Sequence, residues 1–223
     1  RLRSRNAATF AAYFDLGEFQ LLCSSPERFL CVTPSGLVET RPIKGTRGRA
    51  STAIEDAAVV ADLRASPKDH AENVMIVDLM RNDLGRVCAY GSVRVAELCA
   101  VESYAAVHHL VSVVAGQLRP DLAPLDLLRV CFPGGSVTGA PKVRAMEMIA
   151  ELEPTARGAY CGSLGYISLT GAMDTNILIR TFTHGRGWLQ FPVGGGIVAD
   201  SDPTAEYAET MHKAAGLVRA LTP

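Results

Sequence analysis

The chain has 223 residues, 48% of them hydrophobic and 20% charged, a composition typical of a globular protein with a sizeable core. Its formal net charge is −1, which gives no basic field for nucleic acid. No apolar run approaches the ~20 residues that span a bilayer. We therefore expect a soluble cytoplasmic protein without a nucleic-acid or membrane partner, and its six cysteines, which form no CxxC pair, to be reduced thiols.

The first half of the chain is predicted to contain short strands and then helices. Turn signals at Leu16-Gly17 and within residues 34–36 separate β-type runs in residues 10–46. Residues 55–87 are helical in pattern, with a break near Ser66-Pro67 and an end at Gly85. Apolar residues recur there at helical spacing: Val74, Val77, and Met80 or Leu84.

The second half begins with strands in residues 91–118 and a short helix in residues 123–132. A glycine-rich loop then leads into a helix that ends before Pro154, and strand-like runs follow at residues 161–170, 172–184 and 187–199. Asp202 as N-cap and Pro203 at the first helical position begin the last helix. Hairpins and helices without strict β-α-β alternation favour an α+β fold with mostly antiparallel sheet, in one domain over residues 1–223.

Two helices carry acidic side chains at helical spacing. Asp69 and Glu72 lie at i and i+3, and Glu206, Glu209 and Lys213 share one face of the last helix. Carboxylate oxygens from two helices suit Mg²⁺, which keeps several waters and binds substrate oxygens. The spacing alone also fits two solvated helix faces.

Two glycine-rich segments offer backbone amides to a ligand. Residues 132–142 read FPGGSVTGAPK, which is not a nucleotide P-loop because Ala140 and Pro141 precede Lys142. This loop still places N–H groups near a helix start, where an anion can bind. Residues 193–199, VGGGIVA, allow a close backbone approach to a ligand, or else form a β-bulge.

Three further residues have a functional and a structural reading. His108 and His109 are neighbours in a strand-like run and should face opposite sides of the sheet, so one can be core and the other in a site. Arg180 follows an apolar run, where it could hold a carboxylate or form an ordinary surface ion pair.

Lys44 stands in the segment TRPIKGTRGR. A lysine acts as a nucleophile only when its uncharged amine is favoured. Burial beside Ile43, and the positive charges of Arg41, Arg47 and Arg49, could destabilise its ammonium form. The same local sequence also fits a surface lysine.

Together these motifs resemble a known family, the chorismate-utilising enzymes, which include anthranilate synthase component I, aminodeoxychorismate synthase component I, and the isochorismate and salicylate synthases. The similar blocks occur in order along nearly the whole chain: SSPERF, TRPIKGTRGR, KDHAENVMIVDLMRNDLGRV, VHHLVS, FPGGSVTGAPKVRAMEMIAELEP, GAYCGSLGYIS, MDTNILIRT and GGGIVADSDPTAEYAET. The resemblance implies a two-layer, largely antiparallel β core flanked by helices. It also implies a family segment before residue 1, so that the core would be incomplete at the N-terminus.

Within this family, Lys44 indicates the aminodeoxychorismate synthase type, which resembles this chain in carrying PIKGT, whereas anthranilate and isochorismate synthases typically have alanine there. The resemblance implies that Lys44 attacks C2 of chorismate and expels the C4 hydroxyl, after which ammonia attacks C4 and displaces the lysine. Glu27 matches the family's acid–base residue, and His109 matches its active-site histidine. Two alternatives stay open: anthranilate synthase component I, and a domain that only binds a partner or ligand.

The resemblance also implies binding roles. Glu72 and Glu209 match Mg²⁺ ligands, with Asp69 and Glu206 as outer or water-mediated partners. The residues that match substrate-binding positions are Thr46, Tyr160, Arg180, Gly194, Gly195, Gly196 and Lys213. Ammonia would come from a separate glutamine amidotransferase subunit, because this chain shows no glutaminase nucleophile motif.

Overall fold

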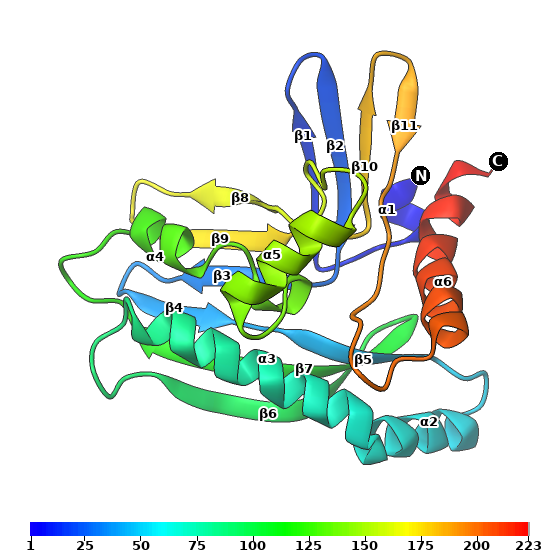
Figure 1. The fold of residues 1–223 in the computed structure, drawn as a ribbon, viewed down its shortest axis with the longest axis horizontal. Coiled ribbons are helices and arrows are strands. Elements are labelled where there is room, and N and C mark those ends of the chain that lie inside the picture. The colour runs from blue at the N-terminus through cyan, green and yellow to red at the C-terminus, as the bar shows by residue number, and fades with distance from the viewer. Residues whose placement is uncertain (223) are drawn as a thin grey trace. The chain divides into compact units, whose positions relative to one another are not determined.

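The computed structural model describes residues 1–222, and these fall into two compact units built from interleaved segments (Figure 1). The first unit comprises residues 1–28, 155–164 and the chain from 175 onward. The second comprises residues 29–154 and 165–174. Each unit is therefore made of pieces that are distant in sequence, with no single linker between them.

The first unit contains a four-stranded antiparallel sheet in the order β1-β2-β10-β11. Its strands are β1 (Phe10–Asp15), β2 (Phe19–Ser25), β10 (Thr181–Gly185) and β11 (Trp188–Gln190). Each half of this sheet is a hairpin, and the turns contain Gly17 and Gly187 with φ of 81° and 83°. The two hairpins join along β2 and β10, where Cys23 pairs with Thr181.

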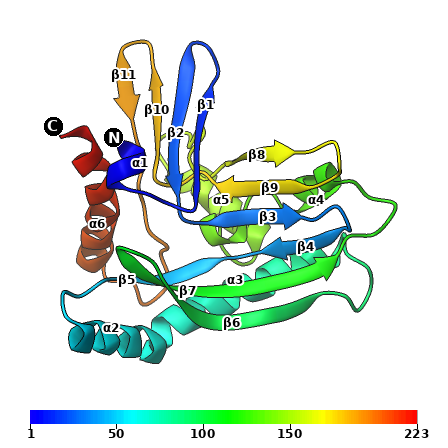
Figure 2. The same ribbon diagram turned by 180° about the vertical axis from the view of Figure 1, so that it is seen from behind.

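Helices α1 (Leu2–Arg5) and α6 (Pro203–Leu221) lie side by side in the same unit (Figures 1 and 2). The approach is close because position 216 is glycine: a Cβ there would lie 2.8 Å from Asn6 Oδ1. Arg5 donates to the carbonyls of Arg219 and Thr222 at 3.1 and 2.8 Å, which satisfies the C-terminal end of α6.

The start of α6 confirms its prediction. Asp202 is the N-cap and accepts a hydrogen bond from Ala205 N at 2.8 Å, and Pro203 is the first helical residue. The short helix α1 was not predicted, because four residues give too little periodicity to detect.

The larger sheet has the order β5-β7-β4-β3-β9-β8, with β6 also paired to β7. The pairs among its first strands are antiparallel. Its strands are β3 (Arg28–Val32), β4 (Leu37–Thr40), β5 (Ile43–Gly48), β6 (Arg94–Ser103), β7 (Val107–Gln117), β8 (Ser163–Ile167) and β9 (Met173–Ile177). Helices together with antiparallel sheet confirm the α+β class.

Helix α3 (Pro67–Gly85) follows α2 (Ala53–Ala65) and covers one face of β5, β6 and β7 (Figure 2). The predicted break at Ser66-Pro67 is confirmed, and Ser66 Oγ accepts from Asp69 N at 3.3 Å as the N-cap of α3. Val77 is buried as predicted, but Val74 is 46% exposed, so its assignment to the apolar stripe was wrong. Ile76, which is 1% exposed, is buried instead.

The remaining helices of the second unit are α4 (Pro124–Cys131) and α5 (Lys142–Leu152), joined by a loop with a 3-10 turn at Gly135–Val137. Both helices were predicted. Lys142 links the two ends of this loop to α3. Its ammonium donates to the carbonyls of Cys131 and Pro133, each at 2.8 Å, and to the Asp83 carboxylate of α3.

Two strand predictions were wrong. The run 172–184 is not one strand but two, β9 and β10, which belong to different sheets. The chain leaves the ladder between Ile177 and Thr181, where Arg180 adopts a φ of 52°, a left-handed value outside the β region. In the run 187–199 only β11 is a strand, because the proline and consecutive glycines that follow add nothing to the ladder.

No helix within residues 1–222 has both the length and the apolar character needed to cross a membrane.

Candidate functional site

The residues predicted for the site are divided between the two units, and each group forms its own set of contacts. The second unit holds Lys44, Thr46, Asp69, Glu72 and His109. The first unit holds the others, namely Glu27, Tyr160, Arg180, Gly194, Gly195, Gly196, Glu206, Glu209 and Lys213.

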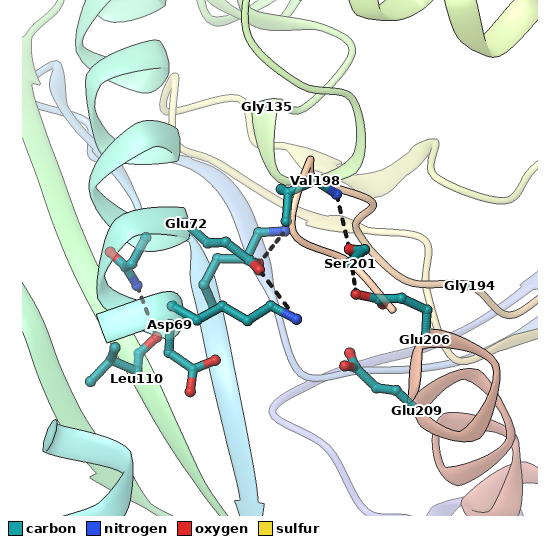
Figure 3. A network of polar contacts seen from close by, with 12 residues as sticks. Asp69, Glu72, Leu110, Gly135, Gly194, Val198, Ser201, Glu206 and Glu209 are labelled. Atoms are coloured by element: carbon teal, nitrogen blue, oxygen red, sulfur yellow. Dashed lines mark hydrogen bonds and ion pairs between the residues drawn. The ribbon is translucent and has the colours of Figure 1, made fainter. Parts of the chain in front are cut away.

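Lys44, on β5, faces Glu72, on α3. Its Nζ lies 3.9 Å from Glu72 Oε2, and Lys68 Nζ lies 3.9 Å from Glu72 Oε1 (Figure 3). The Lys44 and Glu72 side chains are only 17% and 16% exposed. Both contacts are ion pairs too long for a direct hydrogen bond, so the carboxylate oxygens keep lone pairs that a cation or a donor can use.

Asp69 is balanced by an arginine that sequence reasoning did not pair with it. Arg47 donates to Asp69 Oδ2 at 3.0 Å and to Asp62 Oδ2 at 3.0 Å. Burial opposes the charge of the guanidinium, but the two carboxylates outweigh it and raise the pKa of Arg47. Gly45 passes close by with a φ of 83°, and a Cβ on it would lie 3.0 Å from Asp69. The glycine after Lys44 therefore allows β5 to approach α3.

The three arginines around Lys44 have carboxylate partners of their own. Arg41 is paired with Glu102, Arg47 with Asp69 as above, and Arg49 with Asp56 at 2.7 Å. Each of these positive charges is therefore balanced locally by a carboxylate. The contacts of Lys44 with α3 remain.

The two neighbouring histidines of β7 have different partners, as the strand alternation predicted. His109 Nδ1 hydrogen-bonds with Thr46 Oγ1 at 2.9 Å, and its ring is 5.6 Å from that of Tyr104. His108 is 1% exposed and hydrogen-bonds with Asp56 at 3.0 Å. Hydrogen bonds from Arg49 and then from His108 hold the pKa of Asp56 well below its usual range. His108 is thus the structural member of the pair.

A fully buried polar network fixes α3 beside the Lys44 group. Asn73, next to Glu72, donates from Nδ2 to the Leu110 carbonyl of β7 at 3.1 Å (Figure 3). It also accepts a hydrogen bond from Ser112 Oγ. Ser112 Oγ also accepts from the backbone N–H of Cys99 at 2.8 Å. Every polar atom of the Asn73 amide group therefore has a partner, which fixes the rotation of α3 at the position of Glu72.

In the first unit, Tyr160 and Arg180 lie on two segments that are joined by backbone hydrogen bonds. Cys161 N donates to the Leu178 carbonyl at 2.9 Å, and Leu178 N donates to the Gly162 carbonyl at 2.8 Å. Burial lowers the pKa of Arg180, and Tyr160 partly offsets this effect. Within residues 1–222 the Arg180 guanidinium has no carboxylate partner. A half-buried guanidinium without a protein carboxylate beside it is a good receptor for a carboxylate ligand.

The glycine segment, residues 194–196, packs against α6. Lys213 Nζ donates to the Gly194 carbonyl at 3.2 Å. A Cβ on Gly194 would lie 3.0 Å from Tyr160 Oη, and one on Gly195 would lie 3.1 Å from Glu206 Oε2. Close approach explains the glycines, and the β-bulge alternative was wrong, because these residues belong to no strand.

The acidic residues of α6 differ in their surroundings. Glu206 is 7% exposed and accepts a hydrogen bond from Ser201 Oγ at 2.6 Å (Figure 3). The Glu209 side chain is 50% exposed and is paired with Lys213 at 2.6 Å. Glu27 is 6% exposed between β2 and β3, where its carbonyl accepts from Ile177 N at 3.1 Å.

The carboxylates of the predicted site are oxygen ligands of the kind that a magnesium ion uses. Among the described residues 1–222, no three His, Cys, Asp or Glu side chains gather as a ready-made metal cluster. Mg²⁺ does not require one, because it is usually held by one or two carboxylates together with waters and substrate oxygens. Glu72 and Glu209 are partly exposed oxygen donors whose partners are lysines, so the donor chemistry of each unit fits this ion.

A family model described as chorismate binding enzyme matches residues 1–219. The chain belongs to this family. It is 56% identical over 213 residues to aminodeoxychorismate synthase component 1 of Klebsiella aerogenes, covering 96% of this chain and 47% of that protein. It is 53% identical over 221 residues to the Escherichia coli (strain K12) protein of the same name, covering 99% and 49%.

Among solved structures, anthranilate synthase component I from Streptococcus pneumoniae TIGR4 is similar, with a TM-score of 0.86 and 42% identity over 96% of this chain and 47% of that chain. This likeness confirms the predicted fold. The chain spans about half the length of the curated relatives it matches.

Proposed function

We propose that this chain is the chorismate-converting part of an aminodeoxychorismate synthase component 1, which forms 4-amino-4-deoxychorismate for p-aminobenzoate and folate synthesis in the cytoplasm. The observation that carries the proposal is the placement of Lys44. A surface lysine would point into solvent, whereas the Lys44 side chain is 17% exposed and aimed at a carboxylate of α3. The two relatives of that name are also more similar in sequence than the anthranilate synthase structure.

The reaction proceeds by two substitutions. The Lys44 amine forms a bond to C2 of chorismate, the ring double bonds shift, and the C4 hydroxyl leaves as water with a proton from Glu27. Ammonia then bonds to C4, the double bonds shift back, and the lysine amine is released from C2. Splitting one difficult substitution into two is the advantage of a covalent intermediate.

The other residues bind and orient chorismate. Arg180, with Tyr160 beside it, receives a substrate carboxylate, since its guanidinium has no protein carboxylate within residues 1–222. Backbone amides of the glycine segment and the Lys213 ammonium provide further donors. Thr46 and His109 act as a hydrogen-bonded pair, in which the Thr46 hydroxyl orients the imidazole.

The proposed cofactor is Mg²⁺, which supplies positive charge for the ring carboxylate when bound. Glu72 and Glu209 are the proposed ligands. Asp69 and Glu206 are proposed to act through water, because Asp69 already accepts a hydrogen bond from Arg47, and Glu206 one from Ser201. Ammonia is proposed to come from a glutamine amidotransferase partner.

The test is product analysis with chorismate, Mg²⁺ and ammonium, with Lys44→Ala compared with Lys68→Ala. Lys68 is a matched control because its ammonium lies at the same 3.9 Å from the same Glu72 carboxylate. We expect aminodeoxychorismate from the native protein and from Lys68→Ala, and none from Lys44→Ala. Without ammonium, mass spectrometry should find an adduct of chorismate less water on Lys44.

Two outcomes would contradict the proposal. Direct formation of fluorescent anthranilate would assign the chain to the alternative, anthranilate synthase component I. Equal product from Lys44→Ala and the native protein would remove the lysine from the mechanism.

A further inference from the structure

Ser201 lies between the glycine segment and the first turn of α6, and its hydroxyl is used twice. It accepts a hydrogen bond from the backbone N–H of Val198 at 3.1 Å and donates one to Glu206 Oε1 at 2.6 Å (Figure 3). Ser201 N in turn donates to the Val198 carbonyl at 3.0 Å. A hydroxyl can accept and donate at once, whereas an alanine side chain could make neither bond.

The carboxylate that Ser201 contacts is buried, which makes the contact consequential. Glu206 is 7% exposed, and a hydrogen bond from a hydroxyl to a carboxylate is among the stronger ones in proteins. Its other oxygen, Oε2, faces Gly195, where an added Cβ would lie only 3.1 Å away. One loop, residues 194–201, therefore borders both oxygens of Glu206.

The helix on which Glu206 stands is fixed at its start. Asp202 caps α6 by accepting from Ala205 N at 2.8 Å, and Glu206 N donates to the Asp202 carbonyl at 3.0 Å. Because Asp202 directly follows Ser201, the loop leads straight into the start of the helix. A ligand that shifts the glycine segment can therefore change the orientation of the Glu206 carboxylate through the Ser201 hydroxyl.

We propose that Ser201 is a positioning residue that couples substrate binding at the glycine segment to cation binding at Glu206. The coupling rests on the proposed function, in which a chorismate carboxylate binds the glycine amides and Glu206 contacts Mg²⁺ through water. Binding of either ligand then strengthens binding of the other by the same factor, as linkage requires. Nothing in the chorismate reaction itself requires the Ser201 hydroxyl, so its role is separable from the chemistry.

The test measures Mg²⁺ affinity by calorimetry with and without chorismate, in a Lys44→Gln background so that chorismate binds without reacting. Ser201→Ala should weaken Mg²⁺ binding by about 10-fold or more, as loss of an outer-shell partner does. It should also reduce the factor by which chorismate tightens Mg²⁺ binding, leaving only the part that comes from direct attraction between the ion and the chorismate carboxylate. Ser201→Thr, which keeps a hydroxyl, should restore both quantities.

Ser92→Ala is the matched control. The Ser92 hydroxyl also accepts from a backbone N–H, that of Gln117 at 3.1 Å, and donates at 2.7 Å, but its acceptor is the Ala89 carbonyl rather than a carboxylate. It should leave Mg²⁺ affinity and coupling unchanged.

Two results would overturn the inference. The first is that Ser201→Ala and Ser92→Ala have the same Mg²⁺ affinity and the same coupling factor. The second is that Ser201→Ala binds Mg²⁺ more weakly but with an unaltered coupling factor, as a purely structural role would give. The amination assay with Lys44 intact separates the two proposals. Ser201-dependent coupling without aminodeoxychorismate would refute the function and keep the coupling.

Discussion

Lys142→Met tests how far one ion pair holds the loop between α4 and α5. The substitution leaves the Asp83 carboxylate, whose side chain is 6% exposed, without its counterion, and leaves the carbonyls of Cys131 and Pro133 without a donor. Breaking a buried pair in this way costs about 3–5 kcal/mol. In a protein of this size, about 2–4 °C of melting temperature is lost per kcal/mol, so we expect a decrease of roughly 6–20 °C.

The loss should depend on pH in a definite direction. Burial raises the pKa of Asp83, and Lys142 opposes that rise. Without the lysine the pKa rises further above its unfolded value, so the folded protein prefers the protonated carboxyl. Stability is then present at low pH and lost as the pH rises through the folded pKa, and Lys142→Met should be closer to the native protein at pH 5 than at pH 8.

Thermal unfolding followed by circular dichroism at both pH values measures this effect. Arg144→Met is the control on the same helix, since its pair with Glu147 is exposed (62% and 57%) and such pairs contribute about 0–1 kcal/mol. The double variant Lys142→Met/Asp83→Asn, which removes the stranded charge, should recover part of the loss. The reasoning fails if Lys142→Met is no worse than Arg144→Met, or if the double variant is no better than the single one.

Three further predictions concern other parts of the chain. Arg180→Met should abolish chorismate binding in calorimetry while leaving the melting temperature equal or higher, because it removes a half-buried cation without a carboxylate partner within residues 1–222. A clear loss of stability would show that the guanidinium serves the fold. Gly45→Ala should lower the free energy of unfolding by more than the left-handed backbone strain of about 1–2 kcal/mol, because the added Cβ would also press on Asp69. Gly17→Ala, at a φ of 81° with no neighbour within 4 Å, should show the strain alone. Equal melting temperatures of the two variants would contradict this. Burial raises the pKa of Cys131 to about 12 and that of Cys88 to about 11, so neither thiol should react with iodoacetamide at pH 8 until the protein is unfolded; labelling of the folded protein, read by mass spectrometry, would refute the burial.

Sequence reasoning succeeded where the signal is local. The break at Ser66-Pro67 and the start of α6 at Asp202 each depend on the chemistry of adjacent residues, and both are present. It failed at the run 172–184, because alternation continues through a position where the backbone turns to a left-handed φ at Arg180. The sequence pattern does not report that change of direction.

The site shows the same limit. Motifs placed Lys44 and Glu72 together, as the structure does within the second unit. The contact of Arg47 with Asp69 depends on the strand register, and that of Ser201 with Glu206 depends on the turn of the loop before α6. Only the acidic partners could be selected from spacing, since a serine or arginine has no periodic signature of its own.

The pairing of β2 with β10 has a consequence for how the polypeptide is made. β2 is synthesised before the second unit, but its partner, Thr181–Gly185, emerges only after all of that unit. Contacts between such distant segments form slowly because a long loop must close first. The β1–β2 hairpin must therefore wait on the ribosome with an unpaired edge, which makes the first strands of this chain the part most in need of protection by chaperones during synthesis.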